Sequence, residues 1–172
     1  MPATYTLIAS NTLSSSAASV TFSAIPGTYT DLIIKYSARS DESASNTSLM
    51  DVTLNGSSAA NYSVTRLRGS GISAASGRTS NQTYLYFGLN NGPSSTSNTF
   101  TNGEIYIPNY NGSANKCLSH FSAQENNQTE AYIDTNAGLR SVTDAITSVK
   151  LNCNGFNFVS GSSFFLYGIK NS

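Results

Sequence analysis

The chain has 172 residues, and its nine basic and nine acidic side chains give a formal net charge of zero. Only 10% of the residues are charged, against roughly 25% in an average soluble domain, and Ser, Thr and Asn take their place. The Lys and Arg residues are dispersed along the sequence, which argues against nucleic acid as the main partner because phosphate binding needs clustered basic side chains.

Strand-like segments recur every ~10–15 residues, and helical periodicity is nearly absent. In chain order, strands are predicted at 4–10, 19–25, 31–40, 49–56, 61–69, 83–92, 104–108, 116–124, 130–136, 145–153 and 164–170. About ten strands without a break in composition predict a single β-sandwich domain over residues 1–172. We expect an all-β fold with two antiparallel sheets, similar to a jelly roll.

The segment 31–40, DLIIKYSARS, shows the clearest alternation. Leu32, Ile34 and Tyr36 fall on one face of the predicted strand, which we expect to be buried. Pro26-Gly27 before it predicts a turn, because proline presets one backbone angle and glycine permits a positive one.

Two further strands alternate in the same way. Met50, Val52 and Leu54 are predicted to point inward from 49–56. Leu85, Phe87 and Leu89 share one face of 83–92, with Tyr84 and Tyr86 on the other.

Turn residues suggest how some of these strands are connected. Asn55-Gly56 is a hairpin signal and predicts that segment 49–56 pairs with 61–69. The segments 70–82 and 93–103 are rich in Ser, Gly and Asn and are predicted to be loops. We expect these two loops and the N-terminal residues 1–10 to contact neighbouring subunits, since long polar loops become ordered when something covers them.

Two cysteines, Cys117 and Cys153, are too few for a disulfide scaffold. In the predicted registers Cys117 shares a face with Phe121, and Cys153 shares one with Leu151, so both are expected to be buried free thiols. The alternative is one disulfide across the sheet, which would stabilise the fold by ~3–4 kcal/mol.

His120 is the only histidine. The alternation puts it on the opposite face from Phe121, so we expect it to face solvent or a partner. Serines are too abundant to single out a nucleophile, and the G-x-S-x-G motif is missing. The two cysteines and one histidine are not spaced as metal ligands, and the scattered carboxylates offer no pair for glycoside hydrolysis. We therefore expect no enzymatic activity, no metal and no cofactor.

Ten tyrosines stand out in so neutral a chain. Four of them are crowded into strands around one polar loop, and we take these as candidate interface residues: Tyr84, Tyr86, Tyr106 and Tyr110. Outward-facing tyrosine supplies contact area together with a polar hydroxyl, so it suits protein interfaces and stacking on sugars. The alternative is that such residues are ordinary core aromatics.

The sequence TFSAIPGTYTDLIIKYSARS at 21–40 resembles a segment of small virion proteins of tailed bacteriophages, especially cyanophages. The C-terminal ITSVKLNCNGFNFVSGSSFFLYGIKNS at 146–172 resembles the end of the same proteins and of many phage fibre domains. The resemblance implies a virion structural protein assembled in the host bacterial cytoplasm, where cysteines stay reduced. It supplies no catalytic residue. Accordingly, MPATYTLIAS at the start has no secretory signal pattern, and no apolar run approaches the roughly 18 residues of a membrane span.

Two positions on such a particle compete. As a capsid cement or decoration protein, the chain would form a homo-oligomer, expected to be a trimer, that bridges major capsid subunits. As the tip of a tail fibre, it would recognise a glycan on the host surface. A third class, a lectin or glycosidase of cellular origin, has the same expected fold.

Overall fold

The computed structural model describes residues 4–43, 45–127 and 130–170. Those residues form twelve β-strands and no α-helix. The strands, in chain order, are β1 (Tyr5–Thr12), β2 (Ser19–Phe22), β3 (Asp31–Ala38), β4 (Thr47–Leu54), β5 (Tyr62–Gly69), β6 (Ala74–Gln82), β7 (Leu85–Asn91), β8 (Thr101–Ile107), β9 (Lys116–Gln124), β10 (Tyr132–Arg140), β11 (Val149–Asn152) and β12 (Ser163–Ile169). The described part of the chain therefore contains no helix that could cross a membrane.

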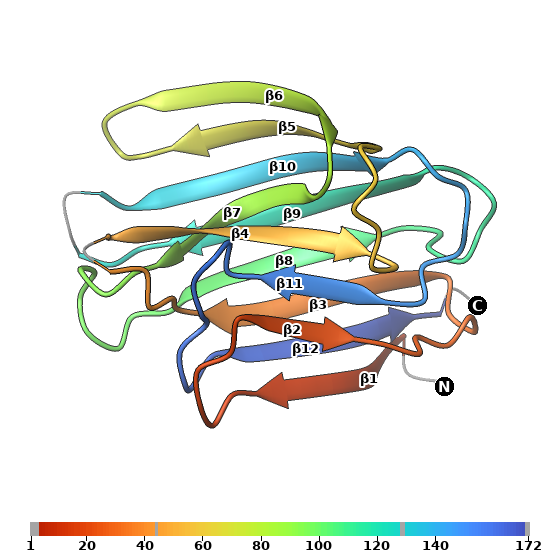
Figure 1. The fold of residues 1–172 in the computed structure, drawn as a ribbon, viewed down its shortest axis with the longest axis horizontal. Helices are drawn as coiled ribbons and strands as arrows, with labels where there is room; N and C mark the ends of the chain where they lie inside the picture. Colours follow the sequence, from red (N-terminus) through yellow and green to blue (C-terminus); the bar gives the residue numbers. More distant parts are fainter. Residues whose placement is uncertain (1–3, 44, 128–129, 171–172) are drawn as a thin grey trace.

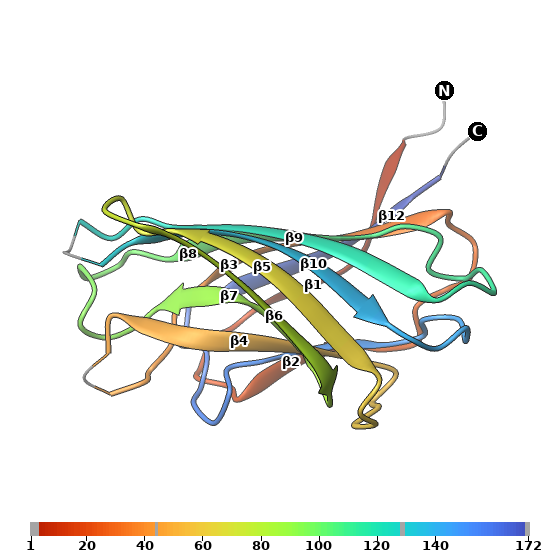
Figure 2. The ribbon, with the colours of Figure 1, turned by 90° about the horizontal axis from the view of Figure 1, so that it is seen from above.

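Two antiparallel sheets form the two layers seen in Figures 1 and 2. The larger sheet has eight strands in the order β1-β12-β3-β8-β9-β10-β5-β6, and the smaller has four in the order β2-β11-β4-β7. The expected all-β antiparallel sandwich is thus confirmed. The similarity to a jelly roll stays a prediction. Three strands that follow one another in the sequence, β8, β9 and β10, are neighbours in the larger sheet, which has twice as many strands as the smaller one.

The core lies between the sheets and follows the predicted alternation. Leu32 and Ile34 of β3 are fully buried, as are Met50, Val52 and Leu54 of β4. Burying one such side chain contributes roughly 1.5–3 kcal/mol, so these alternating strands account for a large part of the stability.

Strand β6 corrects the prediction of a loop over 70–82. Only 70–73 form the turn, and β6 then pairs with β5 from Gly69↔Ala74 to Tyr62↔Gln82. The sequence AASGRTSNQ has no apolar alternation because β6 is an edge strand whose side chains are almost all exposed. Its order comes from backbone hydrogen bonds to β5, which do not depend on the side chains.

The turn at Asn55-Gly56 is present, with φ values of 54° and 63°, but the predicted pairing of its flanking strands is wrong. Strand β4 belongs to the smaller sheet, whereas β5 pairs with β10 and β6 in the larger one. The turn is therefore a crossover between layers.

Gly27 also differs from expectation, because its φ is not positive. A Cβ at this position would lie 2.9 Å from Nδ2 of Asn111, so close packing explains this glycine.

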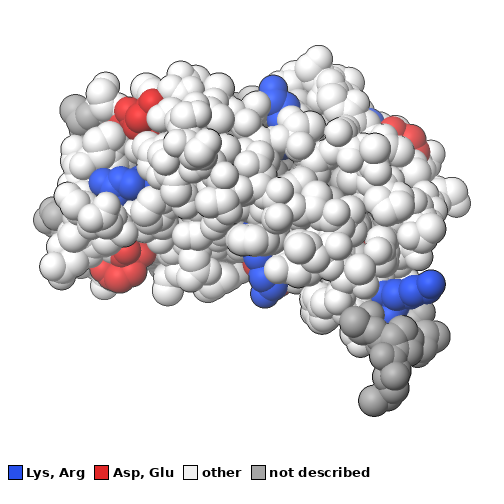
Figure 3. Space-filling view, turned by 90° about the horizontal axis from the view of Figure 1, so that it is seen from below, with Lys and Arg blue, Asp and Glu red and all other residues white. Residues whose placement is uncertain are grey.

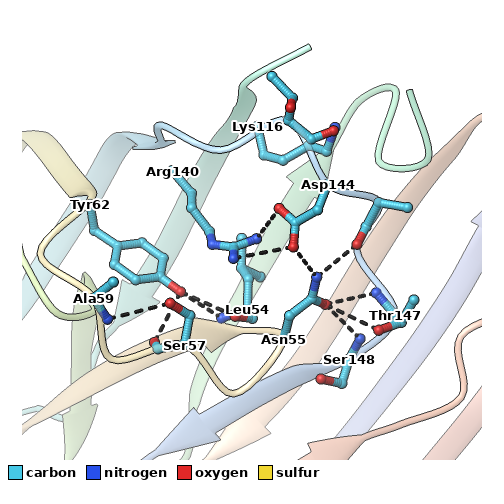
Figure 4. A network of polar contacts seen from close by, with 12 residues as sticks. Leu54, Asn55, Ser57, Ala59, Tyr62, Lys116, Arg140, Asp144, Thr147 and Ser148 are labelled. Carbon is cyan, nitrogen blue, oxygen red and sulfur yellow. Dashed lines mark hydrogen bonds and ion pairs between the residues drawn. The ribbon is translucent and has the colours of Figure 1, made fainter. Parts of the chain in front are cut away.

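A polar network fixes this crossover against the connection between β10 and β11 (Figure 4). The Asn55 side chain donates to Asp144 Oδ2 at 2.9 Å and accepts from the backbone N–H of Thr147 at 2.8 Å. Arg140 donates to the other Asp144 oxygen at 2.8 Å. Partial burial alone would raise the pKa of the Asp144 carboxyl, but the hydrogen bonds from Asn55 and Arg140 outweigh it and lower that pKa.

Strand β9 shows the opposite orientation to the predicted one. Cys117 and Phe121 point outward and are exposed, whereas His120 and Ser122 point into the sandwich and are buried. The two-residue alternation was therefore correct, but the buried face was assigned to the wrong side. Both thiols are free, as expected, and Cys153 is buried, but Cys117 is not.

Candidate interaction surfaces

The outer face of the eight-stranded sheet is unusually apolar for an exposed surface. Leu67 of β5 is 54% exposed, Phe121 of β9 is 49% exposed and Ile133 of β10 is 58% exposed. The strand registers place all three on the side facing away from the smaller sheet, with Thr135 directly opposite both Leu67 and Phe121. A contiguous group of exposed apolar side chains indicates an interaction surface, whereas single scattered ones do not.

A shallow hollow lies within this face. It has a volume of about 300 Å³ and is lined by Leu67, Arg68, Gly69, Ala74, Ile133 and Thr135. Gly69 and Ala74 are among its lining residues, and their small size leaves room for a side chain from another molecule. The hollow could therefore receive an apolar anchor of the kind that dominates protein interfaces.

The charged groups on the same face are held by partners within the chain. Lys35 of β3 and Glu104 of β8 form an ion pair of 2.8 Å between exposed side chains. The Tyr106 hydroxyl donates to Asp31 Oδ2 at 2.9 Å, and this hydrogen bond is the main cause of a raised pKa of Tyr106. Figure 3 shows the molecule from another side, and there too the charged residues are isolated in a white surface.

The four candidate tyrosines do not form one cluster. Tyr106 lies on the outer face just described, while Tyr84 and Tyr86 line a groove beside β7. Tyr110 has no exposed surface, and its hydroxyl donates to the backbone carbonyl of Pro26. Tyr110 is therefore a core residue, and its assignment as a surface contact was wrong. Its position beyond the strand-ending Pro108, where alternation no longer applies, explains the error.

The groove lies where the larger sheet extends past the smaller one. Strands β5 and β6 cross from the layer of the larger sheet toward that of the smaller (Figure 2), and β6 and β7 are each the last strand of their sheet. The groove has a volume of about 330 Å³ and is lined by Val64, Arg66, Gly77, Arg78, Thr79, Gln82, Tyr84 and Tyr86. No carboxylate is among the lining residues. Sequence reasoning singled out the two tyrosines but missed Arg66, because the pairing that brings β5 beside β7 is not local.

Strands β9 and β10 turn a polar layer toward the interior. His120 forms hydrogen bonds at both ring nitrogens: Nδ1 accepts from Asn136 Nδ2 at 2.9 Å, and Nε2 donates to the Tyr36 hydroxyl at 2.8 Å. The imidazole also stacks on Phe87, with ring centroids 5.0 Å apart. Burial lowers the pKa of His120 to about 3, so the ring is neutral at physiological pH. The expectation that His120 faces solvent or a partner was wrong, because this network satisfies both nitrogens inside the fold.

An ion pair completes that layer. Asp134 of β10 is 1% exposed and accepts from Arg68 Nε at 2.8 Å. The Arg68 guanidinium also lies 5.0 Å from the centroid of the Tyr132 ring. The described residues contain no group of three or more His, Cys, Asp or Glu side chains that could hold a metal ion.

Of the predicted loop at 93–103, residues 101–103 belong to β8, and the rest is held by Arg39, which sequence reasoning did not single out. Its guanidinium donates to the backbone carbonyls of Ser95 at 3.1 Å and of Thr96 and Thr99 at 2.9 Å. The loop is thus ordered from within the chain, and its order does not require a partner. Of the N-terminal residues 1–10, those from 4 onward are described, and they lead into β1 at the edge of the larger sheet.

Fold and surfaces together define a two-sheet β-sandwich with a neutral, partly apolar outer face and a groove between the edge strands β6 and β7. No protein-family model matches the chain, and comparison with curated proteins finds no relative.

Proposed function

We propose that this chain is a structural protein of a tailed-bacteriophage virion, and that it acts as a capsid cement protein bridging major capsid subunits, as a homotrimer. The observation behind this proposal is the reversed polarity of β9 and β10. Both strands bury polar side chains and expose large apolar ones: His120 and Asp134 are buried while Phe121 and Ile133 are exposed.

This arrangement is unfavourable for an isolated domain. Burying a charged or polar group costs free energy unless it is fully paired, and exposed apolar surface gains nothing in water. Covering the outer face with another protein removes its exposed apolar surface from water. The polarity of the two strands is therefore best explained by a sandwich that functions with this face against a neighbour.

The size of the face fits that role. Eight strands spaced ~4.8 Å apart span roughly 34 Å, and eight residues of strand span roughly 26 Å, which gives about 900 Å². A standard protein interface buries about 800 Å² on each partner. The outer face of the larger sheet could thus form one complete interface, and its balanced charge makes a protein a better partner than nucleic acid.

The cysteines support assembly in a reducing compartment such as the bacterial cytoplasm. Cys117 is exposed and Cys153 is buried, and both are free. An exposed free thiol is uncommon in proteins that mature in oxidising environments.

The experiment compares two arginine substitutions in binding to phage particles that lack the protein. Leu67→Arg places a charge in the apolar outer face, and Thr21→Arg places the same charge at an exposed position on β2 of the smaller sheet. We expect Leu67→Arg to abolish decoration and Thr21→Arg to leave it unchanged, with hundreds of wild-type copies per particle. Equal decoration by both variants, or a chain that is missing from purified particles, would contradict the proposal.

A second role, the receptor-binding tip of a tail fibre, is favoured by one separate feature. The groove beside β7 combines two half-buried tyrosines with Arg, Thr and Gln side chains, a composition suited to stacking on a sugar ring and hydrogen bonding to its hydroxyls. Copy number separates the roles, since a fibre tip would be present in a few dozen copies or fewer.

A further inference from the structure

Arg66, in the groove between β6 and β7, has no counter-charge among the described residues. Its guanidinium lies 5.3 Å from the centroid of the Tyr86 ring. Within the described residues Arg66 forms no ion pair, and its Nε is buried without a hydrogen bond. The buried Nε is out of reach of a ligand, so a ligand oxygen would be bound by the terminal nitrogens of the guanidinium, of which Nη2 lies 4.0 Å from the position of a Cβ at the groove residue Gly77.

The neighbouring arginine shows what such a contact looks like. Arg68 is two residues further along the same face of β5, and Asp134 neutralises it at 2.8 Å. Strand β10 offers Arg66 no such carboxylate, because the residue opposite is Asn136. Arg78 also borders the groove, but it lies opposite Thr65, on the other face of the sheet from Arg66. Arg66 is therefore the charge that the groove offers to a ligand, on a protein whose net charge is zero.

We propose that this groove binds a carboxylated pyranose, such as a uronic acid unit of an acidic polysaccharide. The carboxylate would accept hydrogen bonds from the Arg66 guanidinium, which matches it as a planar bidentate donor. The inference rests on the second of the two roles proposed above, glycan recognition, and specifies its ligand class.

The remaining lining residues fit the rest of such a ring. Tyr84 and Tyr86 present half-buried aromatic side chains from one wall, and Gln82 and Thr79 present hydrogen-bonding groups near them. The volume of about 330 Å³ lies at the lower end of the range for small-molecule sites, ~300–1,000 Å³. One or two sugar units would fill it.

The test measures binding of trigalacturonic acid and of its fully methyl-esterified form by isothermal titration calorimetry. The two probes share their rings and hydroxyls and differ in charge. We expect the acid to bind and the ester to bind about 10- to 100-fold more weakly, which is the effect of losing a hydrogen bond to a charged group. Affinity for the acid should also fall as salt concentration rises.

Three variants assign the binding to the groove. Arg66→Gln removes the charge and should weaken binding of the acid by the same 10- to 100-fold. Gly77→Val leaves the charge in place but adds a side chain inside the groove, where a Cβ would lie 4.0 Å from Arg66 Nη2. This variant should also abolish binding of the acid. Lys170→Gln, at the end of β12 and six strands away from β6 in the sheet order, removes the same charge elsewhere and should have no effect.

The outcomes separate two kinds of failure. Equal binding of the acid and the ester would retain glycan recognition and overturn the requirement for a carboxylate. Binding of neither probe by the folded wild-type protein would overturn the inference altogether, and binding unaffected by both Arg66→Gln and Gly77→Val would remove it from this groove. A sulfated tetrasaccharide that binds as tightly as the acid would show attraction to any anion and would likewise contradict it.

Discussion

His120 should make the stability of this protein depend on pH in a range where few other groups titrate. Its ring is neutral in the fold, with a pKa lowered by burial from 6.5 to about 3. In the unfolded chain the ring takes up a proton below about pH 6.5. Since the unfolded state then binds more protons than the folded state, the free energy of unfolding decreases as the pH falls toward 3.

The size of the effect follows from the two pKa values. Each pH unit between them costs about 1.4 kcal/mol, and the rounded onset near 6.5 reduces the total between about pH 7.5 and pH 5 to ~2 kcal/mol. That is a substantial part of the 5–15 kcal/mol that stabilises a typical domain.

Urea denaturation of the wild type and of His120→Gln, followed by fluorescence or circular dichroism at several pH values, measures this directly. Glutamine keeps hydrogen-bonding groups near Tyr36 and Asn136 but does not titrate. We expect the wild type to lose ~2 kcal/mol over that range and the variant to show little change. Asp51, whose carboxyl pKa is raised by burial, acts in the opposite direction in both proteins and so cancels in the comparison. The same pH dependence in wild type and variant would show that His120 is not buried in its neutral form.

Three further predictions concern stability and reactivity. Asp134→Asn leaves Arg68, with a side chain 16% exposed, without its counter-charge and should cost about 3 kcal/mol in thermal or urea unfolding, so a variant as stable as wild type would contradict the buried pair. Gly88→Ala should cost at least about 2 kcal/mol, because φ is +73° and the added Cβ would lie 2.7 Å from the His120 ring; an unchanged melting temperature would refute that packing. Iodoacetamide should modify Cys117 alone in the folded protein, since burial raises the pKa of Cys153 to about 11, and mass spectrometry should find both thiols modified only in denaturant.

The predictable part of the fold is the part where one face of a strand is apolar and the other is not. In β4, Met50, Val52 and Leu54 alternate with Asp51 and Thr53, and the structure buries the three apolar side chains completely. Local sequence decides these orientations because no arrangement with the other face buried has comparable apolar area.

Strand β9 shows where this reasoning fails. Its two faces differ little in apolar content, and the presence of Phe121 and Cys117 on one face favoured burying that side. The structure buries the other side, because His120 lies directly opposite Asn136 on β10 and stacks on Phe87 of β7. Those partners lie on other strands, so no reading of residues 116–124 alone could identify them.

The candidate groove was predictable only in part. Alternation along the predicted strand 83–92 places Tyr84 and Tyr86 on the face opposite Leu85 and Phe87, and both tyrosines line the groove outside the core. The presence of Arg66 beside them depends on the pairing of β5 with β10 and on the twist that brings β5 across to β7. Sheet twist and long-range pairing are properties of the assembled fold, which explains why the sequence indicated the aromatic half of the groove and not its charge.

The polar layer also determines which residues remain outside. A one-residue slip of β9 against β10 would turn Phe121 toward the core and expose His120, and apolar burial alone would favour that slip. The slip would also separate His120 from Asn136 and displace Ser122 from its place opposite Asp134, leaving polar groups of the interior unpaired. Because an unpaired buried polar group costs about 1–3 kcal/mol, the hydrogen bonds inside the sandwich fix the observed register. They thereby keep Phe121 and Ile133 on the outer face, where a neighbouring subunit can cover them.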